Sequence, residues 1–238
     1  ITNEVFIDTA TLRKNIVSLA RNIGYTPRPR QAARATVSFT VDTSGVQPSP
    51  ATLTLKKGPV AASAATFAGQ SFVFSILNDI TVPIRNGVAI FNDVEVYEGT
   101  LLTQTYTYSA RIPNQKFILP NAGVDTDLIT VLINPTEASA TETKYNSQDS
   151  LFDVKSESKV YFLQEIEDEN FITINYITSR GDAANGVSSF NFAGKLEHTR
   201  SGSTYNVTTG ISLLTTGIIA SGGETIESVE SIRKFAPR

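Results

Sequence analysis

The sequence predicts a mainly β protein with a few helices: an N-terminal helix, two β-rich, sandwich-like modules and a short C-terminal helix. Short segments with an apolar residue at every second position recur along the 238-residue chain. Turns rich in Gly, Asn and Asp separate these segments. Apolar residues at helical spacing occur near the two ends. With 40% hydrophobic and 18% charged residues, the chain has enough apolar material for a core, which argues against disorder.

The first helix is predicted at residues 8–23. Asp8 or Thr9 is a suitable N-cap. Gly24 suits the left-handed conformation that follows a helix end, and Pro27 prevents the helix from resuming. One buried stripe is expected from the apolar residues at helical spacing, which are Leu12, Ile16, Leu19, Ala20 and Ile23.

From residue 35 the apolar period changes to two, which is typical of half-buried strands. Asn86-Gly87 is the strongest hairpin signal, because a tight mirror-image turn needs positive φ at both central residues. These segments form a first β-rich domain at residues 31–135. Its strands are predicted at 35–42, 52–55, 71–77, 87–96, 104–109, 115–119 and 128–133.

Residues 136–143 (TEASATET) contain no large apolar side chain and mark a boundary. A second β-rich domain is predicted at 136–222, with strands at 151–154, 159–165, 171–178, 187–192 and 204–208. A short helix follows, because Ile226, Val229 and Ile232 have helical spacing and acidic residues precede basic ones. The complete division is 1–30, 31–135, 136–222 and 223–238.

Composition excludes several classes of function. The chain has no Cys, so it has no thiol nucleophile, thiolate metal site or disulfide. Its net charge is −3 and its 20 basic residues are dispersed, so nucleic acid is not an expected partner. No apolar run reaches the ~20 residues of a membrane span. No nucleotide-binding motif is present, and we predict no cofactor and no metal.

The chain begins at Ile1 and contains no Met. We therefore expect it to be a piece of a longer polypeptide, with another domain after the C-terminal helix.

Candidate chemistry is sparse. His198 is the only histidine, so a catalytic triad or a zinc site would have to use it, and we predict an exposed loop residue instead. The acidic cluster at 165–169 lacks the spacing and central Gly of a calcium loop. Asp125 and Asp127 are expected to cap a turn. The sequence does not exclude a pair of carboxylates that cleaves polysaccharides, as in a depolymerase. The chain has no Trp, however, to form a sugar-binding platform.

Residues 180–182 spell Arg-Gly-Asp, the tripeptide that integrins recognise. A three-residue match is weak evidence, because such matches arise often by chance. We predict a turn in which Gly181 and Gly186 supply permissive backbone angles, and in which Asp182 and Asn185 bond to nearby main chain.

Four segments resemble a known family. They are FITINYITSRGDAANGVSSFNFAG (171–194), YFLQE (161–165), ESVESIRKFAPR (227–238) and FIDTATLRKNIVSLARNIGYTPR (6–28). In their order along the chain, these segments resemble the baseplate J-like family, the baseplate wedge proteins of contractile-tailed bacteriophages. The chain departs from the family where Glu169 passes directly into Asn170, and we expect a loop to be missing near residues 165–171.

The resemblance implies a structural protein and not an enzyme. It implies a scaffold, two copies per wedge, that joins wedges into a ring around the tail hub and rearranges on contraction. Other wedge proteins would be its partners, the full-length protein would be a homodimer, and it would reside in the virion tail baseplate after assembly in the host cytoplasm. Contact residues are predicted at Arg28, Arg30, Ile232, Arg233, Lys234 and Phe235. The alternative is a surface adhesin or a carbohydrate-binding β-sandwich, which the fold class equally permits.

Overall fold

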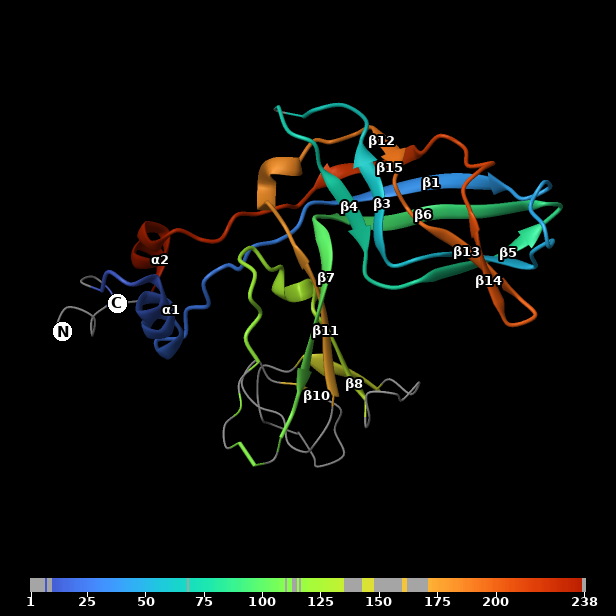
Figure 1. Ribbon diagram of the computed structural model, residues 1–238. Coiled ribbons are helices and arrows are strands. Elements are labelled where there is room, and N and C mark those ends of the chain that lie inside the picture. Colours follow the sequence, from blue (N-terminus) through green and yellow to red (C-terminus); the bar gives the residue numbers. More distant parts are fainter. Residues whose placement is uncertain are drawn as a thin grey trace.

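The computed structural model describes residues 7, 10–67, 69–109, 111–112, 115, 117–134, 143–147, 160–161 and 171–236. This part of the chain is mainly β, with two sheets and two α-helices, α1 (Arg13–Asn22) and α2 (Val229–Phe235), close to its ends. The predicted fold class is therefore confirmed. Figure 1 shows three parts: a large β structure, a smaller sheet that projects from it, and the two helices to one side.

The large β structure has ten strands that fold over on themselves as a sandwich. Since no helix covers them in the described part of the chain, the strands bury their apolar faces against one another. Phe39 stacks on Phe91 in this core, with ring centroids 4.8 Å apart. The strands are β1 (Arg34–Asp42), β2 (Thr52–Leu55), β3 (Gly58–Ser63), β4 (Val73–Ile76), β5 (Ile80–Arg85), β6 (Val88–Glu98), β12 (Phe190–Phe192), β13 (Leu196–Arg200), β14 (Ser203–Val207) and β15 (Thr215–Ser221).

The smaller sheet has the strand order β10-β9-β8-β11-β7. Its central contact is the antiparallel pair β11 and β7, which runs from Phe171↔Thr107 to Thr178↔Thr100. Its buried core holds Val131, Ile133, Ile172, Ile174 and Tyr176. The strands are β7 (Thr100–Thr107), β8 (Thr130–Asn134), β9 (Thr143–Ser147), β10 (Val160–Tyr161) and β11 (Phe171–Thr178).

The smaller sheet is inserted into the sandwich. The chain leaves the sandwich at Glu98, passes through Gly99 into β7, and returns after β11 through the 3₁₀ helix η3 (Gly181–Ala184). Strands on either side of the insertion then pair with each other, β15 with β1, β12 with β3 and β13 with β2. The division at 31–135 and 136–222 stays a prediction about domains, but strands from both segments occur in both sheets.

Helix α1 is shorter than the predicted span of 8–23. Ile16 and Ala20 are fully buried, whereas Leu12 and Ile23 flank the helix and are about half exposed. Gly24 adopts the predicted positive φ, +83°, directly after the helix end. The expected caps, Asp8 and Thr9, lie outside the described residues.

Several strands lie where they were predicted. The Asn86-Gly87 hairpin is also confirmed: it joins β5 to β6, and its two residues have φ of 51° and 78°. The strands predicted at 52–55 and 171–178 match β2 and β11. The described residues of 115–119 form no strand; Phe117 and Leu119 pack instead on the core of the smaller sheet. The strand predicted at 151–154 and the loop expected to be missing near 165–171 fall on residues outside the described part, apart from Phe171.

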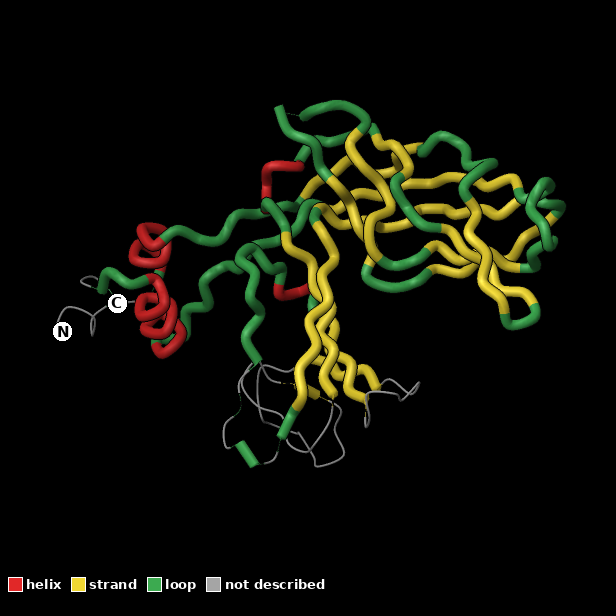
Figure 2. The backbone as a smooth tube through the Cα atoms, viewed as in Figure 1, coloured by secondary structure: helices red, strands yellow, loops and turns green. Residues whose placement is uncertain are grey.

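Helices α1 and α2 pack against each other and form what we call the helix pair. Ile16 and Ala20 from α1 meet Ile232 from α2, and all three are fully buried. Two connectors, residues 24–33 and 222–228, run side by side from the helix pair to the sandwich (Figures 1 and 2). Gln31 and Glu224 bridge them through two reciprocal backbone hydrogen bonds of 3.0 Å each.

Candidate functional site

The six predicted contact residues all lie on the helix pair or its connectors, but they differ in what they contact. Arg28 is exposed and forms an ion pair of 3.2 Å with Glu224. Lys234 lies over the ring of Phe235, with Nζ 5.1 Å from the ring centroid, and Phe235 is 60% exposed. These side chains are at the surface, where a partner can reach them.

The other three predicted residues are used within the chain. Ile232 is fully buried against α1, so it belongs to the core of the helix pair and not to its surface. The Arg233 guanidinium donates hydrogen bonds to main-chain oxygens of Ile7 and Ala10. Arg30 donates to the main-chain oxygen of Ser179, at 2.9 Å. The contact role of all six residues stays a prediction, and these three first of all hold the fold together.

Glu227 organises the helix pair, although its sequence context gives little sign of this. Its carboxylate accepts hydrogen bonds from the Tyr25 hydroxyl at 2.7 Å, the Arg28 N–H at 2.9 Å and the Ser231 hydroxyl at 2.6 Å. Its main-chain oxygen accepts from the Arg13 guanidinium. Glu227 thereby joins α1, the first connector and α2, and the bond to its carboxylate raises the pKa of Tyr25.

The Glu227 contacts predict that the helix pair loosens in acid. Burial alone would raise the pKa of Glu227, but the hydrogen bonds from Ser231, Arg28 and Tyr25 outweigh it and lower this pKa. A carboxyl with a lowered folded-state pKa contributes stability that is complete above its unfolded value, about 4.3, and is lost as pH falls through the folded value. We expect NMR signals of α1 and α2 to lose their native positions below about pH 4, before those of the sandwich.

The matched variants for this pH dependence are Glu227→Gln and Glu230→Gln. Replacing Glu227 should remove the acid transition of the helix pair, because no carboxylate remains to be protonated. Replacing Glu230, which is exposed on α2, should leave the transition in place. A transition that survives in Glu227→Gln would show that another group causes it.

The surface of the helix pair and its connectors carries large apolar residues. Leu12, Ile23, Ile226 and Phe235 are each about half exposed. Single exposed apolar residues are common, whereas several on one small structural unit are typical of interaction sites. The buried side chains of the unit hold it together, and the exposed ones lie at its surface.

Polar contacts join the three parts of the protein at one junction. The Ala32 N–H, in the first connector, donates to the Asp125 carboxylate at 2.7 Å. The Ser179 oxygen accepts from Arg30, and its hydroxyl donates to Glu98 at 2.7 Å. Burial raises the pKa of Asp125, with backbone N–H donors acting in the opposite direction. Asp125 also caps the 3₁₀ turn that follows it, as predicted, but its bond to the connector has no signal in the sequence.

The prediction of an exposed loop for His198 is wrong. His198 lies on β13, is 2% exposed, and stacks on Tyr205 with ring centroids 5.1 Å apart. Neither ring nitrogen has a hydrogen-bond partner in the part of the chain that the structure describes. The prediction missed this strand because most residues of KLEHTR are polar. Within β13 only Leu196 and His198 are buried. Among the described residues, no carboxylate or hydroxyl is bonded to this histidine, as a catalytic triad would require.

We expect His198→Phe to stabilise the protein by about 1–2 kcal/mol, since it removes two buried unpaired nitrogens and keeps a ring against Tyr205. His198→Ala is the matched control and should destabilise, because it leaves a cavity. Urea unfolding followed by circular dichroism measures both. A loss of stability in His198→Phe would mean that the ring nitrogens make hydrogen bonds in solution.

The Arg-Gly-Asp segment forms a turn with the predicted glycine conformations, whereas the side-chain bond predicted for Asp182 is not found among the described residues. Gly181 and Gly186 have φ of 74° and 96°. Asn185 bonds to the main chain of Gly223 through both its side-chain oxygen and nitrogen. The Arg180 guanidinium bonds to Gln70 at 2.9 Å, so it is tied to the sandwich, unlike a freely presented integrin ligand.

Within the described residues, no group of acidic or His side chains could hold a metal ion. None of the described helices has the length and apolar character needed to cross a bilayer. The acidic cluster at 165–169 lies outside the described residues. No protein-family model matches the chain, and no curated protein does.

Proposed function

We propose that this chain is a structural component of a phage tail baseplate wedge. It links wedge subunits into a ring around the tail hub and rearranges on contraction, without enzymatic activity. Its partners are other wedge proteins, the full-length protein is a homodimer, and its location is the virion tail baseplate. The proposal is supported by the ordered resemblance of the four segments 6–28, 161–165, 171–194 and 227–238 to the baseplate J-like family.

The observation that carries the proposal is the helix pair. The described parts of two of the four family-like segments, 6–28 and 227–238, come together in it, although they lie near opposite ends of the chain. Phe235, Leu12, Ile23 and Ile226 are exposed on this unit, while hydrogen bonds and the two connectors fix it to the sandwich. A contact unit with a firm attachment suits a subunit that transmits force between neighbours.

Light scattering after size-exclusion chromatography tests the proposal. The chain is run alone and mixed with each wedge protein encoded in the same genome. We expect a defined complex with at least one of them. The proposal would be overturned if the chain binds none of the tail proteins, and if a longer form of the polypeptide binds none of them either.

The adhesin or carbohydrate-binding alternative predicts a different result. A glycan that binds the folded state raises the unfolding temperature by mass action. Thermal unfolding in the presence of a glycan panel therefore separates the two functions. A shift with one glycan and no complex with tail proteins would favour the alternative.

A further inference from the structure

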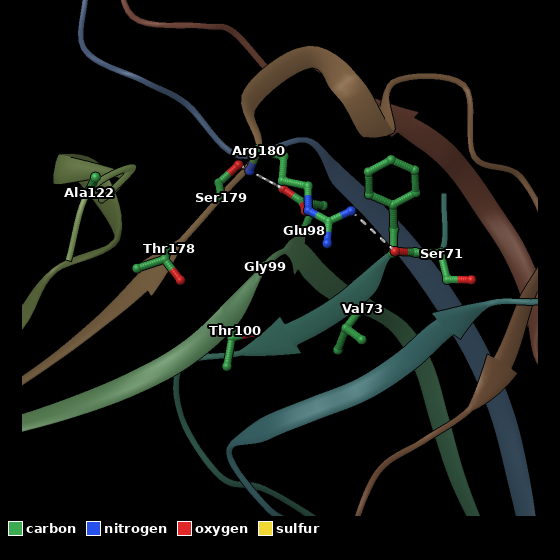
Figure 3. A pocket seen from close by; sticks show the side chains of 10 residues that line it. Ser71, Val73, Glu98, Gly99, Thr100, Ala122, Thr178, Ser179 and Arg180 are labelled. Atoms are coloured by element: carbon green, nitrogen blue, oxygen red, sulfur yellow. Dashed lines mark hydrogen bonds between the residues drawn. The ribbon is translucent and has the colours of Figure 1, made fainter. Parts of the chain in front are cut away.

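A pocket of about 310 Å³ lies where the sandwich meets the smaller sheet. Its wall combines residues from both parts (Figure 3): Ser71, Phe72 and Glu98 from the sandwich, Thr100 and Thr178 from the smaller sheet, and Arg180 from the segment that returns to the sandwich. Ligand pockets commonly span roughly 300–1,000 Å³, so this one suits a small group.

Contacts with Gln70 and Phe72 orient the exposed Arg180 side chain at this pocket. Its Nη1 donates to the Gln70 side-chain oxygen at 2.9 Å, and its guanidinium carbon lies 5.4 Å from the centroid of the Phe72 ring. Its Nε and Nη2 donate to no group among the described residues. A guanidinium whose Nε and Nη2 side is not bonded within the described residues is suited to a carboxylate, which it can bind through two parallel N–H···O bonds.

Glu98 supplies a carboxylate, which accepts hydrogen bonds, on the other side of the pocket's chemistry from the Arg180 donor. It is 3% exposed, and its Oε2 accepts from the Ser179 hydroxyl at 2.7 Å and from the Arg180 main-chain N–H at 2.9 Å. Its Oε1 accepts no hydrogen bond within the described part of the chain, and no ion pair there joins it to the Arg180 guanidinium. This oxygen is reached by solvent and Glu98 lines the pocket, so Oε1 can accept a hydrogen bond from an N–H group of a bound molecule.

We propose that this pocket binds the carboxyl end of an amino acid residue. The carboxylate pairs with Arg180, and the nitrogen of the same residue donates to Glu98. Ser71, Thr100 and Thr178 also line the pocket, and their hydroxyl groups can form hydrogen bonds with the ligand. A dianionic phosphate is disfavoured, because the Glu98 carboxylate would repel it more than a singly charged carboxylate.

Two kinds of ligand carry a carboxylate and a nearby N–H group: the C-terminal residue of a peptide and a free amino acid. Either ligand would contact both sides of the junction and so bind best to one arrangement of the two sheets. This inference does not depend on the proposed baseplate function. Its failure would leave that proposal unchanged.

NMR titration of the protein tests the site with four probes: N-acetyl-Ala-Ala, its C-terminal amide, free alanine and inorganic phosphate. We expect N-acetyl-Ala-Ala or alanine to shift signals of Thr100 and Arg180, with affinity for the amide at least tenfold weaker because it lacks the carboxylate. Binding of N-acetyl-Ala-Ala alone assigns a peptide C-terminus, and tighter binding of alanine assigns a free amino acid. Equal binding of acid and amide, tighter binding of phosphate, or no shifts with any probe would overturn the proposal.

Variants distinguish binding at this pocket from a general effect of the protein's charge on the ligand. Arg180→Gln should weaken carboxylate binding about tenfold or more, and Arg180→Lys should restore only part of it, since the ammonium lacks the two-pronged geometry. Arg85→Gln is the control, because Arg85 is exposed at the distant β5–β6 turn (Figure 1). A native NMR spectrum establishes that each variant is folded. Equal weakening by Arg85→Gln and Arg180→Gln would also reject the site.

Discussion

Gly99→Ala is expected to destabilise the protein by about 3–5 kcal/mol. Gly99 is the residue through which the chain passes from the sandwich to the smaller sheet, and it has a φ of 125°. A Cβ atom there would lie 2.2 Å from the main-chain oxygen of Thr178 and 2.8 Å from a methyl group of Ile177. The first contact is with backbone, so it cannot be relieved by rotating a side chain. Urea unfolding followed by circular dichroism measures the loss.

Gly58→Ala is the matched control for this prediction. Gly58 has a similar φ of 110°, but nothing lies within 4 Å of the position its Cβ would take. This variant should lose only the cost of backbone strain, about 1–2 kcal/mol. The difference between the two variants therefore measures the contact between Gly99 and Thr178. Equal losses would show that the backbones at Gly99 and Thr178 can move apart at little cost.

Close packing at Gly99 explains how the insertion is attached. Gly99 N–H donates to the Val73 oxygen at 2.8 Å, and the Ser75 hydroxyl donates to the Gly99 oxygen at 2.7 Å. On the other side, Thr178 ends β11 next to the position where a Cβ would stand. The smaller sheet is thus held to the sandwich by backbone contacts, and the proposed ligand pocket lies beside them.

Elements whose own residues dictate their conformation could be predicted from the sequence. Gly24 ends α1, and Asn86-Gly87 forms its hairpin, because few residues other than Gly and Asn accept positive φ. Strand β11 has the predicted bounds, since its apolar residues recur in a long β-branched segment. In each of these cases the signal is local.

The insertion and the sites depend on contacts that no local pattern encodes. Strand β15 has adjacent exposed isoleucines, Ile218 and Ile219, and is a strand because β1 offers it an edge. Strand β13 looks like a polar turn because its outward residues are charged or polar. Glu98 and Glu227 resemble ordinary surface acids in the sequence, and only folding brings their hydrogen-bond donors to them. The fold class was therefore predictable, whereas the junction and its pocket were not.

Ile232→Ala and Phe235→Ala are expected to separate the two roles of α2. Ile232 is fully buried against α1, so truncating it should cost about 2–4 kcal/mol. Phe235 is 60% exposed, and its truncation should cost less than about 0.5 kcal/mol. Hydrogen exchange of the α1 amides measures the stability of the helix pair directly, since local opening exposes them. We expect faster exchange in α1 for Ile232→Ala and little change for Phe235→Ala.

The same two variants bear on the proposed contact surface. If Phe235 meets a wedge partner, Phe235→Ala should weaken the complex about tenfold or more while the fold of the free chain is unchanged, as for an exposed aromatic anchor. Phe67→Ala is the control, because Phe67 is 37% exposed and does not belong to the helix pair. If Phe235→Ala and Phe67→Ala bind the partner equally well, the exposed face of α2 is not the contact, and the partner must bind another surface.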